Sequence, residues 1–127
     1  MEAQASILVV DDSPENLQVM AAVLKEQYKV RVAINGERAL ALATAPEPPD
    51  LILLDVMMPG MDGPETLSKL RELVDIEQVP VAFMTAKVQP QEIEQYRLLG
   101  AREVIVKPFD PMTLAAQIRS IWSRVHG

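Results

Sequence analysis

The sequence contains no cysteine and few aromatic residues, and both shortages restrict what the protein can be. Without cysteine there is no disulfide, no thiolate nucleophile and no zinc–thiolate site. Aromatic residues make up 4% of the chain and hydrophobic residues 49%. Aliphatic side chains must therefore fill the core of a globular protein.

Basic charge is also in short supply. The chain has 12 Lys and Arg against 18 Asp and Glu, which gives a formal net charge of -6. Affinity for nucleic acids depends largely on Lys and Arg that replace the counterions around phosphates. We therefore expect no direct nucleic-acid partner.

Long apolar runs are absent as well. The start, MEAQAS, lacks the basic region and apolar stretch of a secretion signal. The apolar run at residues 51–54 is interrupted by Asp55, far short of the roughly 20 residues that cross a bilayer. We expect a cytoplasmic protein without a membrane partner. The length of 127 residues predicts a single domain over 1–127, with its core at about 6–125 and no effector domain.

Four short runs of Val, Ile, Leu and Met recur along the chain without polar alternation. Strands that are apolar on both sides are typical of a parallel sheet covered by helices on both faces. A fifth run, residues 30–33, contains Arg31 and is predicted to be an edge strand. The four apolar runs are residues 7–10, 51–54, 81–84 and 104–106.

Segments with a helical period separate these runs. Leu17, Met20 and Leu24 follow a helical spacing, with Ser13 as the predicted N-cap and Pro14 as the first helical residue. Further helices are predicted around residues 40–43, 67–74, 93–99 and 114–125. Strands and helices therefore alternate strictly, which predicts right-handed βαβ units and a doubly wound α/β fold.

A polar residue directly follows four of the five predicted strands. Open α/β sheets bind their ligands outside the carboxyl ends of the strands, where the strand order reverses. In a sheet of order 2-1-3-4-5 the first and third strands are neighbours there, so three carboxylates would converge. A hydroxyl and an ammonium group would arrive from the adjacent strands. The residues concerned are Asp11, Asp12, Asp55, Thr85 and Lys107.

Such a group of carboxylates needs a counter-charge. Two carboxylates about 4 Å apart repel by roughly 4 kcal/mol at an effective dielectric constant near 20. Three together therefore take up protons or hold a cation. Oxygen ligands without histidine or cysteine among them suit Mg²⁺, which also accepts phosphate oxygens. Asp55 is then predicted to be a nucleophile of the aspartyl-phosphate kind, with Lys107 and Thr85 contacting the phosphoryl oxygens.

Four motifs stand at these strand ends. They are Asp11-Asp12, LLDVMMPGMDG at residues 53–63, MTA at residues 84–86 and KPF at residues 107–109. In this order and spacing they resemble the receiver domain of two-component response regulators, and the resemblance covers essentially the whole chain. It implies a flavodoxin-like (βα)5 fold with the strand order 2-1-3-4-5.

The resemblance also implies a function. The protein would take a phosphoryl group from a histidine kinase or a phosphotransfer protein onto Asp55, and would then signal to a downstream protein through its surface. Lys107 would pair with the phosphoryl group, and Thr85 would move to hydrogen-bond it. The protein would assist its own phosphorylation and dephosphorylation without being an enzyme in the usual sense.

A metal site and an unusual peptide bond are implied in the same way. Asp12 and Asp55 would bind Mg²⁺ directly, Asp11 through a water molecule, and Met57 through its backbone carbonyl. The peptide bond before Pro108 would be cis, which only an X-Pro bond forms cheaply.

Val104 departs from the pattern of the family. Most receivers carry Tyr or Phe three residues before the lysine, and that ring turns inward when the threonine shifts. Valine has no ring, and its β-branch restricts the side chain. We therefore predict that phosphorylation changes residues 85–91 and the start of the next helix more than the fifth strand. Met57 and Lys87 occupy positions that tune how long the phosphoryl group survives.

Other interpretations compete with this one. Acidic residues such as Asp11 and Asp12 also cap helices, and Asp62 with Gly63 is interpreted as a turn. An alternative function is a receiver-like adaptor that acts mainly through constitutive protein contacts, which Val104 favours. An FMN carrier or a phosphatase on the same fold fits poorly, because the aspartates would repel phosphate and Met57 stands where such a phosphatase needs a second aspartate.

Overall fold

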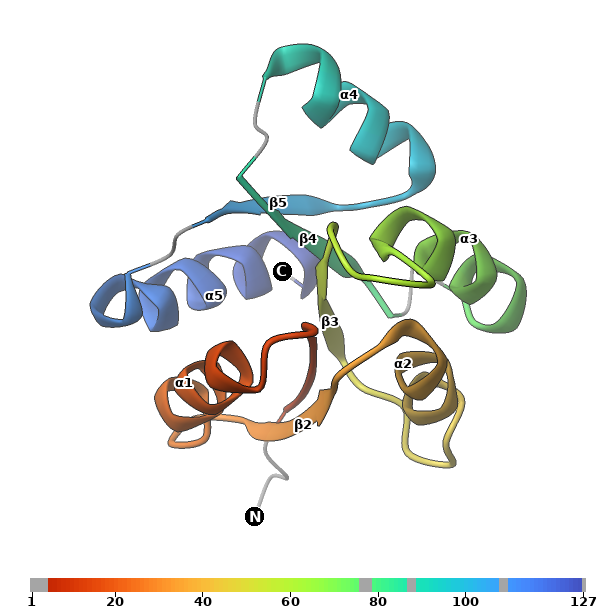
Figure 1. Ribbon diagram of the computed structural model, residues 1–127. Helices are drawn as coiled ribbons and strands as arrows, with labels where there is room; N and C mark the ends of the chain where they lie inside the picture. The colour runs from red at the N-terminus through yellow and green to blue at the C-terminus, as the bar shows by residue number, and fades with distance from the viewer. Residues whose placement is uncertain (1–4, 76–78, 87–88, 108–109, 127) are drawn as a thin grey trace.

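Five strands alternate with five helices in the described part of the computed structural model, which comprises residues 5–75, 79–86, 89–107 and 110–126. The strands are β1 (Ser6–Val10), β2 (Lys29–Ala33), β3 (Leu51–Asp55), β4 (Val81–Thr85) and β5 (Glu103–Val106). The helices are α1 (Pro14–Leu24), α2 (Gly36–Ala43), α3 (Gly63–Leu73), α4 (Pro90–Leu99) and α5 (Pro111–His126). All strand pairs are parallel, in the order β2-β1-β3-β4-β5 (Figure 1). The predicted doubly wound fold and strand order are confirmed.

The central strands are buried on both faces. Every residue of β3 and β4 is buried, as their unbroken apolar sequence predicts, whereas β2 is partly exposed at the edge of the sheet. β3 and β4 each extend one residue further than predicted, to Asp55 and Thr85. The reason is that a ladder depends on backbone pairing rather than on side-chain polarity: Val56 N–H still donates to the Met84 carbonyl.

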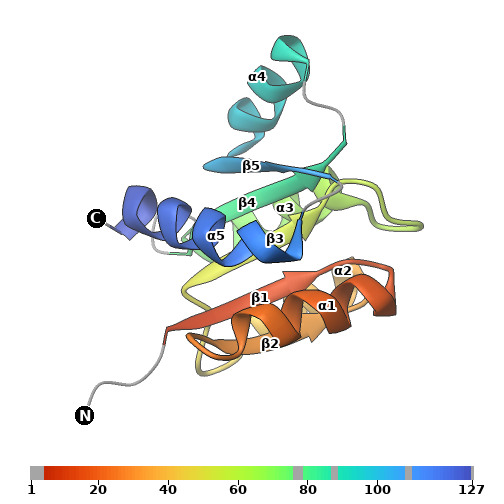
Figure 2. The same cartoon turned by 90° about the vertical axis from the view of Figure 1, so that its left-hand side faces the viewer.

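Two hydrophobic clusters lie on opposite faces of the sheet, because successive side chains of a strand point to opposite sides. One cluster joins Ile7 and Leu53 to α1 and α5. The other joins Leu54 and Phe83 to α2, α3 and two residues of α4, the buried Tyr96 and the half-buried Leu99. Figures 1 and 2 show α1 and α5 together on one side of the sheet and α2 and α3 on the other.

Side-chain caps begin four of the helices, and before α5 Asp110 Oδ1 accepts from Met112 N–H at 2.8 Å. Ser13 Oγ accepts from Asn16 N–H at 3.3 Å, which confirms the predicted N-cap of α1, and Asn35 caps α2. Asp62 and Gly63, interpreted from the sequence as a turn, instead begin α3. Asp62 Oδ1 accepts from the Glu65 N–H at 2.9 Å, and Gly63 is the first helical residue.

The helices contain at most 16 residues, the length of α5. Within the described ranges, no helix combines the length and apolarity that a membrane span requires. Two features expected from the sequence, the role of Lys87 and the cis peptide before Pro108, lie outside the described residues.

Candidate functional site

The register of the strands brings the predicted site residues into one row. Val10 pairs with Leu54, so Asp11 and Asp55 occupy matching positions one residue further along. Thr85 pairs with Val106, so Lys107 lies just beyond Thr85 at the same edge. The backbone pairing alone therefore gathers side chains from β3, β4 and the ends of β1 and β5.

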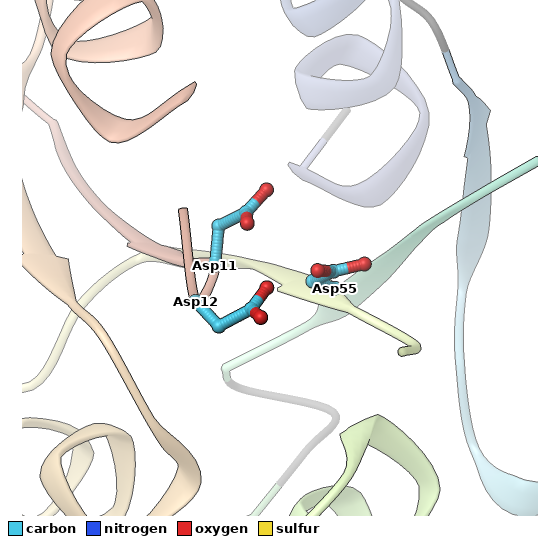
Figure 3. Close-up of side chains that lie close together, drawn as sticks. All are labelled: Asp11, Asp12 and Asp55. Atoms are coloured by element: carbon cyan, nitrogen blue, oxygen red, sulfur yellow. The ribbon is translucent and has the colours of Figure 1, made fainter. Parts of the chain in front are cut away.

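Three carboxylates meet at the ends of β1 and β3 (Figure 3). Asp11, Asp12 and Asp55 each place one oxygen within 4.8 Å of the others. Asp11 is only 1% exposed and Asp55 only 3%, whereas Asp12 is exposed. The predicted convergence of the three carboxylates is therefore seen in the structure, which also shows that two of them are buried and one is exposed.

Lys107 bridges the two buried carboxylates. Its Nζ lies 3.0 Å from Asp55 Oδ1 and 3.2 Å from Asp11 Oδ2, and its side chain is 22% exposed. A single ammonium group therefore connects residues from three strand ends. Because charge-assisted hydrogen bonds are among the stronger ones, this contact holds both carboxylates in place.

The site perturbs the proton affinity of its own groups. Burial raises the pKa of the Asp55 carboxyl above its ordinary value of 3.8; the hydrogen bond from Lys107 opposes this rise, and the negative charge of Asp11 adds to it. Burial by itself would lower the pKa of Lys107, but its hydrogen bond to Asp55 and the two negative charges raise the pKa above 10.5. The lysine is therefore charged at neutral pH, and Asp55 carries an unfavourable negative charge.

Asp11 is held by α1 as well as by the lysine. Its Oδ1 accepts from Ser13 N–H at 2.9 Å, and its Oδ2 accepts from Asn16 Nδ2 at 3.3 Å. Asn16 is a contact of the site that the strand-end motifs do not indicate. Its position five residues after Asp11, one turn into the capped helix, is the available signal.

Met57 and Thr85 have more indirect places in the site. Met57 N–H donates to Asp55 Oδ1 at 3.4 Å, and its side chain is exposed. The Thr85 carbonyl accepts from Lys107 N–H at 2.9 Å, and the residue is 2% exposed. The side chains of Asp55 and Thr85 point to opposite faces of the sheet. Asp55 lies two residues after Leu53 and shares its face, and Thr85 lies two residues after Phe83 and shares that of Phe83.

The donor set fits a hard divalent cation. It consists of oxygen atoms alone, from three carboxylates whose charges with that of Lys107 sum to -2. Buried carboxylates close together favour a bound cation because it offsets their mutual repulsion. This part of the molecule can therefore hold a metal ion next to a buried carboxylate and an ammonium group.

Comparison with known proteins agrees with this geometry. The family profile of the response regulator receiver domain matches residues 7–119. The chain therefore belongs to the receiver-domain family of response regulators, the class that the strand order and the acidic cluster also indicate.

Individual relatives include short and long proteins. Protein PilH of Pseudomonas aeruginosa is 36% identical over 118 residues, which is 92% of this chain and 97% of that protein. Response regulator PleD of Caulobacter vibrioides is 42% identical over 118 residues, and a probable cyclic di-GMP phosphodiesterase of Vibrio cholerae is 36% identical over 124 residues. The match covers 92% and 98% of this chain, respectively, but only 26% of either relative.

Solved structures show the same likeness. The chemotaxis protein CheY4 of Vibrio cholerae superposes with a TM-score of 0.86 at 32% identity. The superposition covers 94% of this chain and 99% of that one. The predicted fold and family are thus confirmed by independent comparisons.

Proposed function

We propose that residues 1–127 form a single receiver domain that accepts a phosphoryl group on Asp55 and thereby switches a protein-interaction surface. The observation that carries this proposal is the position of Asp55, buried at the end of a central strand with the acidic cluster on one side and Lys107 3.0 Å away. A nucleophile, a cation site and a phosphate-binding charge thus lie together.

Mg²⁺ is the proposed cofactor. Asp12 and Asp55 would ligate it directly, Asp11 through water, and Met57 through its backbone carbonyl. When bound, the ion supplies positive charge that offsets the charge developing on the transferring phosphoryl group. Asp11 is already held by Ser13 and Asn16, which suits a carboxylate that orients a water molecule rather than one that must move.

In the proposed transfer, a carboxylate oxygen of Asp55 attacks the phosphorus atom of a phosphohistidine. A P–O bond forms, the P–N bond breaks, and the imidazole nitrogen keeps the electron pair. The product is an acyl phosphate, which water later hydrolyses to restore the carboxylate. The raised pKa of Asp55 makes this buried carboxylate more basic than an exposed one, which favours attack.

Lys107 and Thr85 would act after the phosphoryl group arrives. Lys107 is charged and already aimed at Asp55, so it would exchange part of its contact with the carboxylates for phosphoryl oxygens. The Thr85 hydroxyl would turn to hydrogen-bond the same oxygens. The protein would in this way assist its own phosphorylation and dephosphorylation.

The donor would be a histidine kinase or a phosphotransfer protein, and the output would be contact with a downstream protein. The net charge of -6 argues against direct binding of nucleic acid. We propose a cytoplasmic location without a membrane partner, as expected for a domain that meets such a kinase.

A constitutive adaptor is the second candidate. The observation that favours it is Val104, an aliphatic side chain on β5 that is half-buried against the cluster containing Phe83. With little volume to rearrange at this position, the surface could keep its shape whether or not Asp55 is modified.

Phosphorylation itself tests the proposed function. The protein is incubated with Mg²⁺ and acetyl phosphate, and adducts are located by mass spectrometry. We expect one acid-stable, alkali-labile phosphoryl group on Asp55, none in Asp55→Asn, and an unchanged adduct in the control Asp75→Asn, which alters an exposed aspartate. A phosphoryl group that persists in Asp55→Asn would disprove the assignment.

Metal binding is measured on the same proteins by titrating amide shifts with Mg²⁺. We expect affinity in the millimolar range that weakens as the pH falls, because the carboxylates must be deprotonated. Asp12→Ala should lose the response. Unchanged binding in Asp12→Ala would move the metal site elsewhere.

A further inference from the structure

Helix α4 buries a single side chain against the rest of the domain. Among the residues of α4, all of which the structure describes, only Tyr96 is buried, at 7% exposure. Ile93 and Leu99 are half-buried, and Leu98 is 72% exposed. By contrast, α1 buries three side chains, Leu17, Met20 and Leu24. Figure 1 shows α4 at the β4–β5 end of the sheet, and Arg71 of α3 hydrogen-bonds to the carbonyl of Leu99 at the end of α4.

The buried contact of Tyr96 is with an aromatic residue of β4. Its ring lies edge-on to Phe83, with centroids 5.2 Å apart and an interplanar angle of 83°. Phe83 is fully buried. Edge-to-face pairs at this distance contribute beyond their buried area, and they depend on the relative position of both rings. The position of α4 is therefore tied to the position of Phe83.

Phe83 is also the neighbour of a site residue. It lies two positions before Thr85 on β4, so both side chains point to the same face of the sheet. Asp55, by contrast, follows the alternation of the face that α1 and α5 cover. Of the two polar residues that end β3 and β4, Thr85 is therefore the one on the face where Tyr96 packs.

The partner of Phe83 on the next strand is Val104. Phe83, Val104 and Tyr96 belong to one cluster, in which both rings come from β4 and α4 and the β5 position is aliphatic. The large side chain that can respond to a shift of β4 thus comes from the helix. A movement of Tyr96 must move α4 itself, whereas a side chain on β5 could change rotamer alone.

From these contacts we infer that Tyr96 is the residue through which the phosphorylation site controls the position of α4, by way of Thr85 and Phe83. This inference rests on the proposed phosphorylation of Asp55. A shift at the end of β4 alters the fit between Phe83 and Tyr96, and α4 has no second fully buried side chain to hold it. The other contacts of α4 are weaker: Leu99 is only half-buried against the same cluster, and Arg71 Nη1 donates to the Leu99 carbonyl at 2.9 Å from an exposed position. The equilibrium between docked and displaced α4 is therefore most sensitive to the Tyr96 contact.

Hydrogen exchange of α4 tests the inference. Exchange is followed by mass spectrometry with and without Mg²⁺ and beryllium fluoride, a phosphoryl mimic. Tyr96→Leu keeps apolar bulk and removes the ring, and Tyr96→Phe keeps the ring. The matched control is Tyr28→Leu, since Tyr28 is equally buried at 8% and pairs with Trp122 at 5.7 Å on the opposite face.

The expected results separate anchoring from general stability. Without the mimic, the amides of α4 in Tyr96→Leu should exchange faster by about tenfold or more. In the parent protein local opening of α4 must break the contact between the two rings, and in the variant this cost is removed. The mimic-induced change in α4 should be lost in Tyr96→Leu and retained in Tyr96→Phe and Tyr28→Leu. Mg²⁺ affinity and phosphorylation of Asp55 should stay within about twofold of the parent protein in all three variants, because Tyr96 does not touch the site.

Two results would overturn the inference. One is a normal α4 response to the mimic in Tyr96→Leu, and the other is an equal effect of Tyr28→Leu on α4, which would indicate general destabilisation. Failure of the proposed function is distinguishable: the parent protein would then take up neither the mimic nor a phosphoryl group. In that case the proposed control of α4 by phosphorylation is also wrong. Hydrogen exchange of Tyr96→Leu and the parent protein, both without the mimic, still decides whether Tyr96 anchors the helix.

Discussion

Asp55 illustrates how a functional residue can oppose the stability of its own domain. It is 3% exposed at the end of a strand that is otherwise apolar. The hydrogen bond from Lys107 compensates only part of the loss of hydration, and for this reason the pKa of Asp55 lies above 3.8. An ionised carboxylate whose pKa is raised by folding destabilises the folded state at neutral pH.

We predict that Asp55→Asn stabilises the protein at pH 7 in the absence of divalent cations, by about 1 kcal/mol. The sign follows from linkage: the cost of ionising Asp55 is absent below pH 3.8, sets in as the pH rises through the raised pKa, and persists above it. The gain should therefore disappear on acidification. Chemical denaturation at several pH values measures it, with the exposed Glu72→Gln as control. A loss of stability at pH 7 would contradict the prediction.

Lys107 has the opposite effect on stability. It is a base, so its raised pKa means that its charged form stabilises the folded state, and this stabilisation is fully present below pH 10.5. We predict that Lys107→Ala destabilises the metal-free protein by about 2 kcal/mol, because Asp11 and Asp55 lose their shared counter-charge. Mg²⁺ affinity should be equal or slightly higher, since a competing cation is removed, while the response to phosphorylation should be impaired.

Denaturation with and without Mg²⁺ measures the effect of Lys107→Ala. The control is Lys69→Ala, whose exposed pair with Glu65 spans 4.0 Å and contributes little. Loss of metal binding in Lys107→Ala would show instead that the lysine is needed to build the site.

At the scale of elements, the start of α3 is fitted closely against the end of β3. A Cβ added at Gly63 would lie 2.5 Å from the backbone oxygen of Asp55 and 2.7 Å from Val56 Cα. Gly63 N–H also donates to the Val56 carbonyl at 3.0 Å. The helix can therefore begin next to the candidate phosphoacceptor only if its first residue is glycine.

We predict that Gly63→Ala destabilises the protein by about 2 kcal/mol. In an unobstructed helix the same change would be neutral or favourable, because alanine has the higher helix propensity. The clash with backbone atoms of Asp55 and Val56 reverses the sign. Denaturation midpoints decide the matter, with Ser68→Ala on the exposed side of α3 expected to stay within about 0.5 kcal/mol. A stabilised Gly63→Ala would show that α3 can shift freely.

At the scale of the whole molecule, the site lies at one end of the sheet, and the two faces of the sheet are covered by different helices. Asp11 and Asp55 follow the alternation of the face covered by α1 and α5, whereas Thr85 follows that of the face where Phe83 and Tyr96 lie. The more firmly attached α1 and α3 each bury three or more side chains, whereas α4 buries one. Conformational change should therefore concentrate where the fewest buried contacts must break.

We predict that phosphorylation shifts the amide signals of residues 85–91 and of the first turn of α4 more than those of β5. The physical reason is that Val104 can fill or vacate little volume, so β5 gains little differential packing between the two states. Amide shifts with and without beryllium fluoride measure the distribution. Val104→Ala should preserve it, because the responding contact involves Tyr96.

Changes centred on Val104 and β5, with residues 85–91 silent, would contradict this prediction. No change beyond the acidic cluster and Lys107 would support the constitutive adaptor instead. These patterns are distinct, so one titration of the parent protein and the Val104→Ala variant separates them.

The sequence by itself determined the class of fold, the edge strand, the cap of α1 and the identity of the candidate site residues. These depend on local signals: unbroken apolar runs, proline after serine, and polar residues at strand ends. The four motifs at the strand ends also sufficed for the family, which the matching profile confirms. The pair Asp62 and Gly63 shows the limit of such signals, since the same residues suit a turn or a helix start.

Only the tertiary structure decided how these residues meet. The register of the strands sets Asp11 beside Asp55 and brings Lys107 to both, although Lys107 lies 96 residues from Asp11 in the chain. Helix packing brings Tyr96 onto Phe83. These contacts depend on distances between elements that are remote in sequence, and no local preference encodes such distances. They arise when the apolar faces of helices and sheet are buried together, which is why the candidate residues could be named from the sequence but their contacts could not.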